Sequence, residues 1–441
     1  MKSNLRYLSL FKIYFLILFS FSLYSTDLKI ASYNVENLFD LTKNGTEYKE
    51  YIPYKHNWNQ KIFKKKLLNS AEVICDVNAD IIGLQEVENK HVLKLLQKTL
   101  RKIGCHYKYL AITHKKHSAI QVALLSKIPI VNVKEIVVNR KLGFRPILEV
   151  KFRVDRQPFF VYVNHWKAKS SPESYRIRSA KVLRDRLKAL PKGSEYVLLG
   201  DFNADYDEYL HLERKHNDSN GKTGINHVLH SIDDFGKMLR VNSLYSNRFT
   251  HYNLWLELPN YRRWSHNFYG DKEGLDNILL PYTLFDGKGL EYVSHSFNVL
   301  KKSYLFHKKG YIYRWVYRNN RHLGKGYSDH LPVFATFSTN KPYKRVLFRA
   351  KEGNINSLQK REVHFPLHLT KVKVFSVSKN RVIIGKQDSK QRIAIYGTKE
   401  LLKLGKSYDI MVYGRDFFKG RYEIIDFEIE KRYDTPLKLK D

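Results

Sequence analysis

The sequence contains few sulfur-bearing side chains for a chain of 441 residues: three methionines and only two cysteines, Cys75 and Cys105. Two cysteines cannot form the disulfide framework of a small secreted scaffold, nor a site in which several thiolates bind a metal. A Cys75–Cys105 bridge is compatible with an oxidising compartment, but the sequence does not establish it. Cys75 also fits the apolar pattern of AEVICDVNADIIGL as a small core residue.

Acidic residues are also scarce, since 43 Asp and Glu stand against 78 Lys and Arg, giving a formal net charge of +35. A field of this sign attracts phosphate backbones and anionic lipid surfaces alike. A generally basic proteome, or solubility through self-repulsion, would also give this charge. The sequence is 43% hydrophobic and 14% aromatic, which excludes a disordered chain. Its length exceeds that of one common core, so we expect two folded units.

Residues 1–25 have the pattern of a secretory signal. Lys2 and Arg6 precede the apolar stretch LSLFKIYFLILFSFSLYS, and the polar segment TDLK follows. Lys12 interrupts this stretch, which is short for a membrane span. We expect a cleaved signal peptide; the alternative is an uncleaved N-terminal anchor, which would be the only membrane contact. Both place the folded part outside the cytoplasm, as a secreted or periplasmic protein.

From Leu28 the sequence alternates between strand-like and helix-like segments. Apolar runs predict strands in KIASYNV, ADIIGLQEV, AIQVALLSK, FRPILEVKFRV, QPFFVYVNHW, SEYVLLGDFN, LDNILLP and HLPVFATF. Helical spacing predicts helices in WNQKIFKKKLLNSAEVICDV, in HVLKLLQKTLRKIG up to Gly104, and in SPESYRIRSAKVLRDRLKAL after Pro172. Strands this apolar between helices indicate a buried sheet system of α/β or α+β type.

The residues after Phe337 differ in character. Residues 339–366 are polar, basic and weakly patterned, and we expect a linker there. Residues 367–434 contain five short strand patterns, VKVFSVS, RVIIGKQ, RIAIYG, SYDIMVYG and YEIIDFEIE, with the helix candidate TKELLKLG after the third. This layout resembles OB-fold domains and implies a small all-β barrel. Another small barrel or a sandwich is the alternative.

Polar side chains that suit metal-assisted phosphate chemistry lie beside several of the apolar strands. Hydrolysis of a phosphodiester needs a hard cation on the phosphate and a deprotonated water, and hard cations prefer oxygen ligands. In chain order, the fragments are Asn34 in IASYNVENLF, Glu86 in IIGLQEVEN, His165 in VYVNHWKAKS, Asp201 and Asn203 in LLGDFNAD, Asp276 in EGLDNILLP, and Asp329 and His330 in GYSDHLPVF. Each fragment alone is typical of a solvated strand end or turn, but the ordered set is specific.

This ordered set resembles the endonuclease/exonuclease/phosphatase superfamily, and most closely its extracellular nuclease branch related to deoxyribonuclease I. The resemblance covers residues 28–338 and implies a four-layer sandwich in which helices flank two β-sheets. It implies Mg²⁺ as the cofactor, with Mn²⁺ or Ca²⁺ as alternatives, and assigns Asn34, Glu86 and Asp329 to the metal.

The resemblance also assigns the acid–base groups. Asp201 and Asn203 would orient or deprotonate the attacking water and hold the phosphate. His330 would act as a base whose tautomer is fixed by Asp276, because an isolated imidazole is poorly aimed. His165 would be the general acid for the leaving oxygen. The partner of that histidine is a glutamate in the family, whereas the aligned segment here has Gln121, which stabilises an imidazolium less well.

Basic residues near these motifs are candidates for substrate binding, and Arg145 fits a family position that contacts the phosphate backbone. Lys167 and Arg178 are further candidates, although a solvated surface explains each equally well. The same holds for Lys169, Arg176 and the cluster Arg262-Arg263-Trp264, which would either stack on a strand of nucleic acid or fold over the sheet. In the C-terminal part, the candidates are Lys386, Arg392, Arg415 and Arg421, with Tyr396, Tyr413 or Phe417 as stacking platforms.

The sequence therefore favours an exported, divalent-metal-dependent nuclease that hydrolyses phosphodiester bonds of nucleic acid, with DNA as the favoured substrate. One alternative uses the same residues on lipid head groups, as sphingomyelinase-like relatives do. Another is a nucleic-acid binder with vestigial chemistry, which the complete residue set disfavours. The OB-like domain, the positive charge and the NHWKAK segment weigh against the lipid alternative. An anionic membrane surface would also explain the charge, so this alternative stays open. No obligate protein partner is evident from the sequence.

Overall fold

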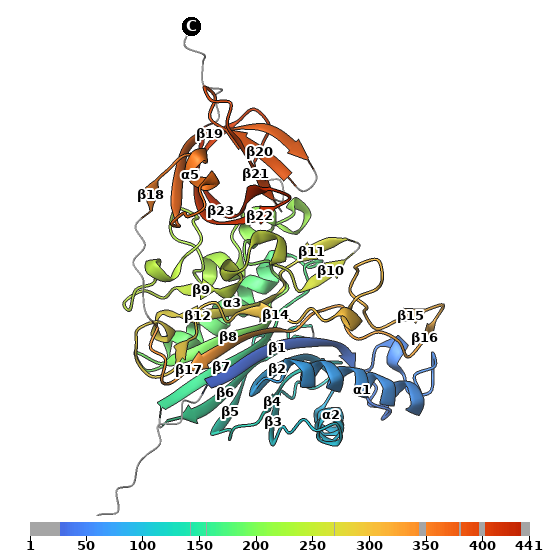
Figure 1. The fold of residues 1–441 in the computed structure, drawn as a ribbon. Helices are drawn as coiled ribbons and strands as arrows, with labels where there is room; N and C mark the ends of the chain where they lie inside the picture. Colours follow the sequence, from blue (N-terminus) through green and yellow to red (C-terminus); the bar gives the residue numbers. More distant parts are fainter. Residues whose placement is uncertain are drawn as a thin grey trace, which may run out of the picture.

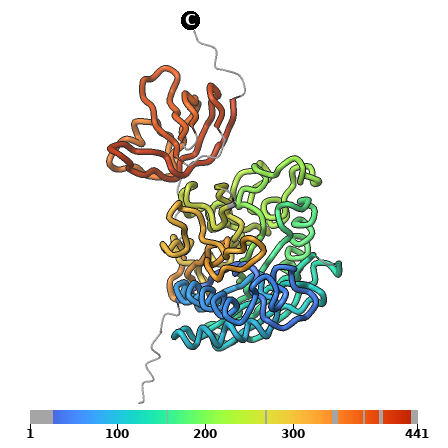
Figure 2. Tube along the Cα trace, turned by 90° about the vertical axis from the view of Figure 1, so that its right-hand side faces the viewer, coloured from blue at the N-terminus to red at the C-terminus, as the bar shows by residue number. Residues whose placement is uncertain are grey.

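The computed structural model describes residues 27–141, 143–155, 157–268, 270–343, 350–378, 381–396 and 402–433. The expected signal segment, residues 1–25, lies outside these ranges. Within them, no helix is both long and apolar enough to cross a membrane. A larger unit of sheets and helices carries a smaller β unit at its C-terminal side, and a view from the side separates the two clearly (Figures 1 and 2).

The first sheet is built around the long strand β1 and contains seven strands in the described part of the chain. Their order is β13–β17–β1–β2–β4–β3, and β14 also pairs with β17. β1 is parallel to β2 and antiparallel to β17. The bounds are Asp27–Leu38 (β1), Ile81–Val87 (β2), Tyr109–Ile112 (β3), Gln121–Ser126 (β4), Glu291–Tyr292 (β13), Asn298–Val299 (β14) and Val333–Ser338 (β17).

The second sheet has the order β5–β6–β7–β8–β12–β9. Its only parallel neighbours among the described strands are β7 and β8, and α3 connects them along the chain. The bounds are Asn132–Ile136 (β5), Ile147–Val154 (β6), Gln157–His165 (β7), Glu195–Asp201 (β8), His251–Asn253 (β9) and Asp276–Pro281 (β12). Two short hairpins project from the larger unit: His266–Phe268 (β10) with Asp271–Glu273 (β11), and Tyr317–Arg318 (β15) with Arg321–His322 (β16).

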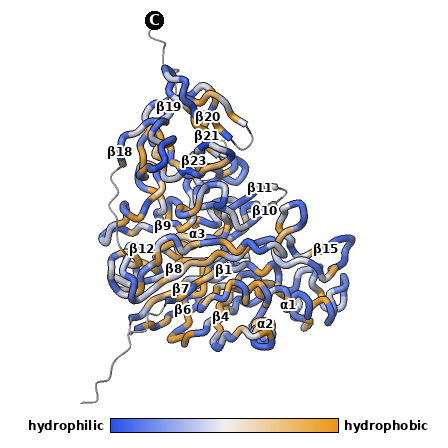
Figure 3. The backbone as a smooth tube through the Cα atoms, viewed as in Figure 1, coloured by the Kyte–Doolittle hydropathy of each residue, from blue (hydrophilic) through white to orange (hydrophobic). Residues whose placement is uncertain are grey.

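The two sheets pack against each other, and their strands are apolar on both faces for this reason. β1, β2 and β4 contact β7 and β8 across the interior. The packing is close at Gly83 of β2, where a Cβ atom would lie 2.5 Å from Leu199 and 2.9 Å from Val163. Hydrophobic residues accordingly concentrate in the strands of the larger unit (Figure 3). The expected α/β class is confirmed.

Helices pack against both sheets. Gln60–Val77 (α1) and Lys90–Lys102 (α2) add apolar residues to the cluster of the first sheet, whereas Glu173–Lys188 (α3) packs Ala180, Leu183 and Leu187 with residues of the second. Side chains of Asn59 and Asn89 accept backbone N–H groups at the starts of α1 and α2, which explains where these helices begin. Short helices lie at Glu208–His211 (α4) and Ile355–Gln359 (α5).

The C-terminal unit is a small closed β-barrel of five strands within the residues described. The strand order is β19–β20–β21–β23–β22, β22 pairs again with β19, and β21 is parallel to β23. The bounds are Leu367–Ser378 (β19), Arg381–Gly385 (β20), Arg392–Tyr396 (β21), Ser407–Phe418 (β22) and Arg421–Tyr433 (β23). Half of the expected helix TKELLKLG, residues 398–401, lies outside the described ranges, and residues 402–405 form no helix.

The segment 339–366, expected to be a linker, contains ordered structure. Lys351–Glu352 (β18) pairs with β19, and α5 follows it. Ile355 and Leu358 of α5 are buried in the hydrophobic cluster of the barrel. The polar composition concealed this element because only two of its side chains supply the buried contacts.

Ion pairs join the barrel to the larger unit. Asp426, Glu428 and Glu430 alternate along β23 and so project from one face of the strand. Arg263 Nη2 lies 2.7 Å from Asp426 Oδ1, Arg240 Nη2 lies 2.9 Å from Glu428 Oε1, and Lys237 pairs with Glu430. This row of carboxylates fixes the barrel against a basic patch of the larger unit, which we define as Lys237, Arg240 and Arg263.

Candidate active site

On the second sheet, three predicted site residues are lateral neighbours. Asp201 is the last residue of β8, His165 of β7 pairs with it on one side, and Asp276 of β12 pairs with it on the other. Gly200 permits this arrangement, because its φ is 136° and a Cβ atom there would lie 2.1 Å from the carbonyl oxygen of Asn164. A glycine before Asp201 thus allows β7 and β8 to stay paired up to the site.

Asn34 connects this group to the first sheet. Its Nδ2 donates to Oε1 of Glu86 at 3.2 Å and to Oδ2 of Asp201 at 3.1 Å, while its Oδ1 accepts the backbone N–H of Glu36. Asn34 is fully buried. A neutral amide therefore holds two carboxylates that would otherwise repel each other, and it adds no further charge.

The backbone around Glu86 is irregular at the point where β2 pairs with its neighbours. The register shifts next to Glu86 on both sides of β2, and Glu86 has a φ of 65°. Bulges of this kind redirect a side chain. Oε2 of Glu86 accepts the backbone N–H of Asn37 at 2.9 Å, and the side chain remains 19% exposed. The carboxylate consequently faces the solvent-accessible side of the site.

Asp201 and Asn203 follow each other across a sharp turn. Oδ1 of Asp201 accepts the backbone N–H of Asn203 at 2.8 Å, and Nδ2 of Asn203 donates to the carbonyl of Trp166 at 3.1 Å. Burial is the main reason that the pKa of Asp201 is raised to about 6, and the nearby Asp276 adds to the effect. A carboxylate with a pKa in this range can accept a proton near neutral pH.

His330 has the partner that the sequence predicted. Its Nδ1 lies 2.7 Å from Oδ2 of Asp276, which also accepts a hydrogen bond from Ser265 Oγ at 2.6 Å. Burial alone would lower the pKa of His330, but the carboxylates of Asp276, Asp201 and Asp329 raise it well above the usual value. The imidazole is therefore held as a cation, with Nε2 facing Asp201 at 3.9 Å.

His165 lies on the other side of Asp201 from His330. Its surroundings favour the neutral imidazole, whereas those of His330 favour the cation. Its Nε2 is 3.5 Å from Oδ2 of Asp201 and 3.8 Å from Oε1 of Glu86. Burial lowers the pKa of His165 well below the usual value, and the charges of Arg145 and His330 contribute in the same direction. His165 is therefore neutral in the resting site.

Gln121 does not serve as the partner of His165. Its Oε1 accepts from Thr113 Oγ1 and from the backbone of Lys115, and its Nε2 donates to the carbonyl of Lys115. Nδ1 of His165 is buried and has no hydrogen-bond partner among the residues that the structure describes. The expected contact fails because the amide is saturated by the segment that precedes β4.

Asp329 belongs to a charge network that the motifs did not indicate. Arg314 Nη2 lies 3.3 Å from Oδ2 of Asp329 and 2.6 Å from Oε1 of Glu36. Although burial opposes it, the charges of His330 and Arg314 lower the pKa of Asp329. Ser328 Oγ donates to the carbonyl of Asn34 at 2.7 Å, which places the Asp329 segment directly beside β1.

The three predicted substrate-binding residues lie along one rim, which we call the basic rim: Arg145, Lys167 and Arg178. Arg145 Nη1 donates to the carbonyl of Trp166 at 2.9 Å, next to His165. The guanidinium of Arg178 lies over the ring of Phe144, and Nζ of Lys167 lies close to Gly143. Residues 143–145, which precede β6, therefore contact or contribute all three cations, and Arg145 lies next to His165.

Several other basic candidates have structural partners instead. Lys169 forms ion pairs with Asp205, Glu208 and Glu273. Arg176 is buried against Glu173, and Arg263 against Asp426 of the barrel. Trp264 is buried, with Lys301 and Lys272 over its ring. Within the cluster Arg262-Arg263-Trp264, the side chains of Arg263 and Trp264 are therefore buried against other parts of the protein.

The oxygen donors fit a hard divalent cation. Asn34, Glu86 and the Asp329 segment surround the end of β1, and the carboxylates of Glu86 and Asp329 are the partly exposed ones, at 19% and 21%. Magnesium and calcium prefer carboxylate and amide oxygens with room for water. The carboxylates of Glu86 and Asp329 therefore have suitable chemistry and access. Asn34, in contrast, is fully buried and turns its Nδ2 toward Glu86 and Asp201, so that it supports the metal carboxylate rather than facing solvent.

Sequence reasoning missed Arg314, Ser265 and His266. Arg314 lies in an irregular insertion without a periodic pattern, Ser265 precedes the short hairpin of β10 and β11, and His266 is the first residue of β10. His266 forms an isolated backbone bridge with His330, and the rings are 4.8 Å apart. Ser265 and His266 belong to the segment RRWSH, residues 262–266. The sequence singles out the two arginines and the tryptophan of this segment, but it gives no separate indication for the serine or the histidine.

The chain was compared with known proteins. A model of the Endonuclease/Exonuclease/phosphatase family matches residues 29–339. A search of curated proteins finds no match.

Solved structures similar to the chain share low sequence identity with it. TDP2 of D. rerio, in complex with a single-strand DNA product, is 14% identical, with a TM-score of 0.44 and coverage of 71% of this chain and 99% of that chain. A family protein from Bacteroides thetaiotaomicron is 14% identical, with a TM-score of 0.43 and coverage of 72% and 99%. A family protein from Leptotrichia buccalis is 15% identical, with a TM-score of 0.41 and coverage of 70% and 99%.

Proposed function

The chain belongs to the endonuclease/exonuclease/phosphatase family, and on this basis we propose that it is an exported, divalent-metal-dependent nuclease that hydrolyses phosphodiester bonds, preferentially in DNA. The proposal includes the branch related to deoxyribonuclease I and the four-layer order of helix, sheet, sheet and helix. The observation that carries it is the single cluster in which Asn34, Glu86, Asp201 and His330 meet from different sheets.

In the proposed reaction, a Mg²⁺ ion bound by Asn34, Glu86 and Asp329 would polarise the phosphate and stabilise its developing charge. Asp201 accepts a proton from the attacking water, a role that its raised pKa of about 6 supports. Asn203 holds the water or a phosphate oxygen. Asp276 and Ser265 fix the ring of His330, whose positive charge then faces the phosphate.

The charges of the two histidines favour roles that differ from those inferred from the family. A cationic His330 is suited to stabilising the phosphate or protonating the leaving oxygen, whereas an acid role of His165 would require it to gain a proton first. The neutral His165 instead suits a donor or acceptor of a hydrogen bond near Glu86 and Asp201. We therefore assign the acid to His330 and the base to Asp201.

The basic rim and the C-terminal barrel support a polymeric substrate. The strand order of the barrel, with its third and fifth strands parallel, is compatible with an OB-type domain. A groove of about 960 Å³ in the larger unit includes Lys90, Lys115 and Lys116 in its lining, together with the carboxylates of Asp40 and Glu88. Cations along such a groove attract a phosphate backbone.

Two observations support export. Residues 1–25 have the pattern of a secretory signal. The structure also contains a Cys75–Cys105 disulfide, a bond that persists in oxidising compartments.

The deciding experiment incubates the purified protein with plasmid, linear duplex, single-stranded DNA, RNA and sphingomyelin vesicles, with Mg²⁺ and with excess chelator. We expect cleavage of DNA with Mg²⁺ and none with chelator. Hydrolysis of sphingomyelin alone would replace the proposal with the lipid alternative. Full DNA cleavage in chelator would refute the metal dependence.

A further inference from the structure

His266, Asp329 and His330 form a compact cluster at the edge of the active site. One potential ligand atom from each of them lies within 4.8 Å of the others. Their side chains are 13%, 21% and 6% exposed, so the cluster is shielded but reachable from solvent. The backbone bridge between His266 and His330 holds the two imidazoles side by side.

Each imidazole has a carboxylate behind it. Nδ1 of His330 lies 2.7 Å from Asp276, and Nδ1 of His266 lies 3.3 Å from Glu273. Metal-binding histidines commonly have this arrangement, in which the carboxylate orients the ring and increases the basicity of the other nitrogen. Nothing in the Mg²⁺ chemistry described above uses His266 or Glu273.

The two oxygens of Asp329 face different neighbours. Oδ2 lies 3.3 Å from Arg314, whereas Oδ1 lies 4.0 Å from Nε2 of His330. Oδ1 is therefore the oxygen on the histidine side. Four carboxylates surround the imidazoles, namely Asp201, Asp276, Asp329 and Glu273, and these outnumber the nearby cations Arg314 and Lys169 and the protonated His330, whose proton a bound metal would release. The local charge thus favours a bound cation.

We propose that His266, Asp329 and His330 form a second cation site that selects a borderline transition metal of the Zn²⁺ class over Mg²⁺. Two imidazole nitrogens and one carboxylate are ligands that such metals prefer, whereas Mg²⁺ prefers oxygen. Ligand atoms about 2.0–2.2 Å from a tetrahedral Zn²⁺ are roughly 3.3 Å apart. Closing the cluster from its present spacing requires ligand shifts of order 1 Å, which side-chain rotation can provide.

Occupation of this site has a consequence for catalysis, and this part of the proposal rests on the proposed function. A Zn²⁺ ion would take Asp329 from the Mg²⁺ set and would bind the nitrogen of His330 that faces Asp201. The protein would then be inhibited by Zn²⁺ even when Mg²⁺ is saturating. Binding itself requires no assumption about the reaction.

The first experiment measures binding on the metal-free full-length protein by calorimetric titration with Zn²⁺. We expect one equivalent to bind, with affinity retained in excess Mg²⁺. His266→Gln should weaken binding by at least about tenfold, and Glu273→Gln by roughly 10–100-fold through loss of the supporting carboxylate. The matched control is His91→Gln, an exposed histidine on α2, which should bind as the wild type does.

Co²⁺ serves as a spectroscopic probe of the same site, because its visible absorption reports nitrogen and oxygen ligation. The His266→Gln spectrum should lose intensity, and circular dichroism establishes that each variant is folded. Unchanged Zn²⁺ affinity in folded His266→Gln, or displacement of Zn²⁺ by equimolar Mg²⁺, would overturn the site.

A second experiment titrates Zn²⁺ into the Mg²⁺-supported cleavage assay and expresses each rate relative to the zinc-free rate of the same variant. Zn²⁺ should inhibit the wild type, and His266→Gln should require at least about tenfold more Zn²⁺, in proportion to its weakened binding. Equal inhibition of both would refute the catalytic consequence. A protein that binds Zn²⁺ but cleaves no phosphodiester would refute the proposed function and leave the site standing.

Discussion

Asp201 lies between two histidines that differ in charge, because their surroundings differ. His330 is close to three carboxylates and is held as a cation, whereas His165 is buried near Arg145 and stays neutral. Asn34 separates Asp201 from Glu86 without adding charge. Pairs of titratable groups whose pKa values move apart are typical of acid–base sites. The side chains therefore support an assignment of roles that their sequence order alone did not give.

Replacement of either acid–base group should abolish most turnover. We expect Asp201→Asn and His330→Ala each to reduce kcat by about 10²–10⁴-fold, the usual contribution of a general acid or base. The rate of DNA cleavage under saturating Mg²⁺ tests this, with His106→Gln as the matched surface control. Near-normal turnover in a folded His330→Ala protein would show that the cluster is not the catalytic site.

His251 provides a test of stability that is independent of catalysis. It is fully buried, where its Nε2 lies 3.0 Å from the hydroxyl of Tyr196 and its Nδ1 contacts the carbonyl of Leu229. Burial lowers its pKa from 6.5 to about 4. Because the folded state binds the proton less tightly, stability is complete above pH 6.5 and is lost as the pH falls toward 4.

Each pKa unit corresponds to ~1.4 kcal/mol, so His251 should account for about 3 kcal/mol of stability lost between these pH values. Urea unfolding of wild type and His251→Gln at several pH values measures the difference. The variant should be less stable at pH 7 and should lose less stability on acidification. Parallel pH dependence in the two proteins would contradict the assignment.

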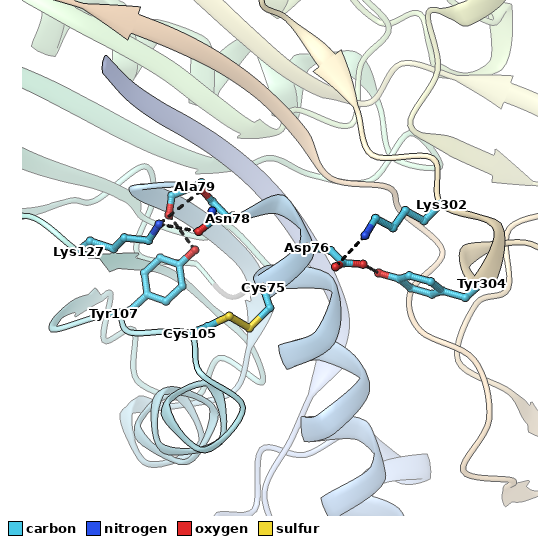
Figure 4. Close-up of a disulfide and its surroundings, with 9 residues drawn as sticks. All are labelled: Cys75, Asp76, Asn78, Ala79, Cys105, Tyr107, Lys127, Lys302 and Tyr304. Atoms are coloured by element: carbon cyan, nitrogen blue, oxygen red, sulfur yellow. Dashed lines mark hydrogen bonds and ion pairs between the residues drawn. A yellow bond between two sulfur atoms is a disulfide. The ribbon is translucent and has the colours of Figure 1, made fainter. Parts of the chain in front are cut away.

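The paired cysteines tie α1 to the segment that follows α2. Cys75 in α1 and Cys105 are disulfide-bonded, and nearby Asp76 pairs with Lys302 and Tyr304 on another segment (Figure 4). These bonds connect the helices that cover the first sheet to each other and to the insertion after β14. The disulfide thus reinforces the outer layer rather than the active site.

Removal of the disulfide should destabilise the larger unit without altering the chemistry. A bridge with a sequence separation of 30 residues contributes about 3–4 kcal/mol in the chain-entropy model. Thermal unfolding of the Cys75→Ser/Cys105→Ser protein should show a lower Tm, with kcat unchanged at 25 °C. A reductant should lower the Tm of the wild type but not of the variant. An unchanged Tm in both cases would mean that the bond carries no stability.

Apolar periodicity predicted the elements that build the core, but not the irregular parts that complete the site. The strands that carry Asn34, Glu86, His165 and Asp201 were identified because continuous apolar runs precede these polar residues. Arg314 and His266 were not, since only the tertiary packing of their insertions brings them to Asp329 and His330. Gln121 occupies the sequence position of the family's glutamate, but its side chain bonds to Thr113 and Lys115 instead of His165.

The contact between the barrel and the larger unit lies close in sequence to the segment that supports His330. Arg263, held by Asp426 of the barrel, is two residues before Ser265, which bonds Asp276. Tyr413, which was a candidate stacking platform, instead packs its ring 3.8 Å from the guanidinium of Arg240. The barrel therefore helps to hold the segment that contacts Asp276 in place. Its role is not restricted to binding a polymer.

Breaking this link should lower kcat as well as weaken binding. We expect Arg263→Ala to reduce kcat several-fold, because the Ser265–His266 segment loses its anchor. Lys237→Ala is the matched control: it removes an ion pair of the same interface, but Lys237 lies far along the chain from Ser265. Steady-state kinetics separate the two, since lost uniform binding raises KM and spares kcat. Equal kcat values in both variants and the wild type would refute the link.

The acidic row of β23 also neutralises cations that a polyanion would otherwise meet. Asp426, Glu428 and Glu430 repeat every two residues, roughly 6.8 Å along a strand, which equals two nucleotide steps of about 3.4 Å. The row thus imitates a short stretch of phosphates lying on Lys237, Arg240 and Arg263. The basic patch is therefore already occupied by carboxylates of the protein itself. Under the proposed function, a polymer would instead meet the cations of the basic rim, Arg145, Lys167 and Arg178.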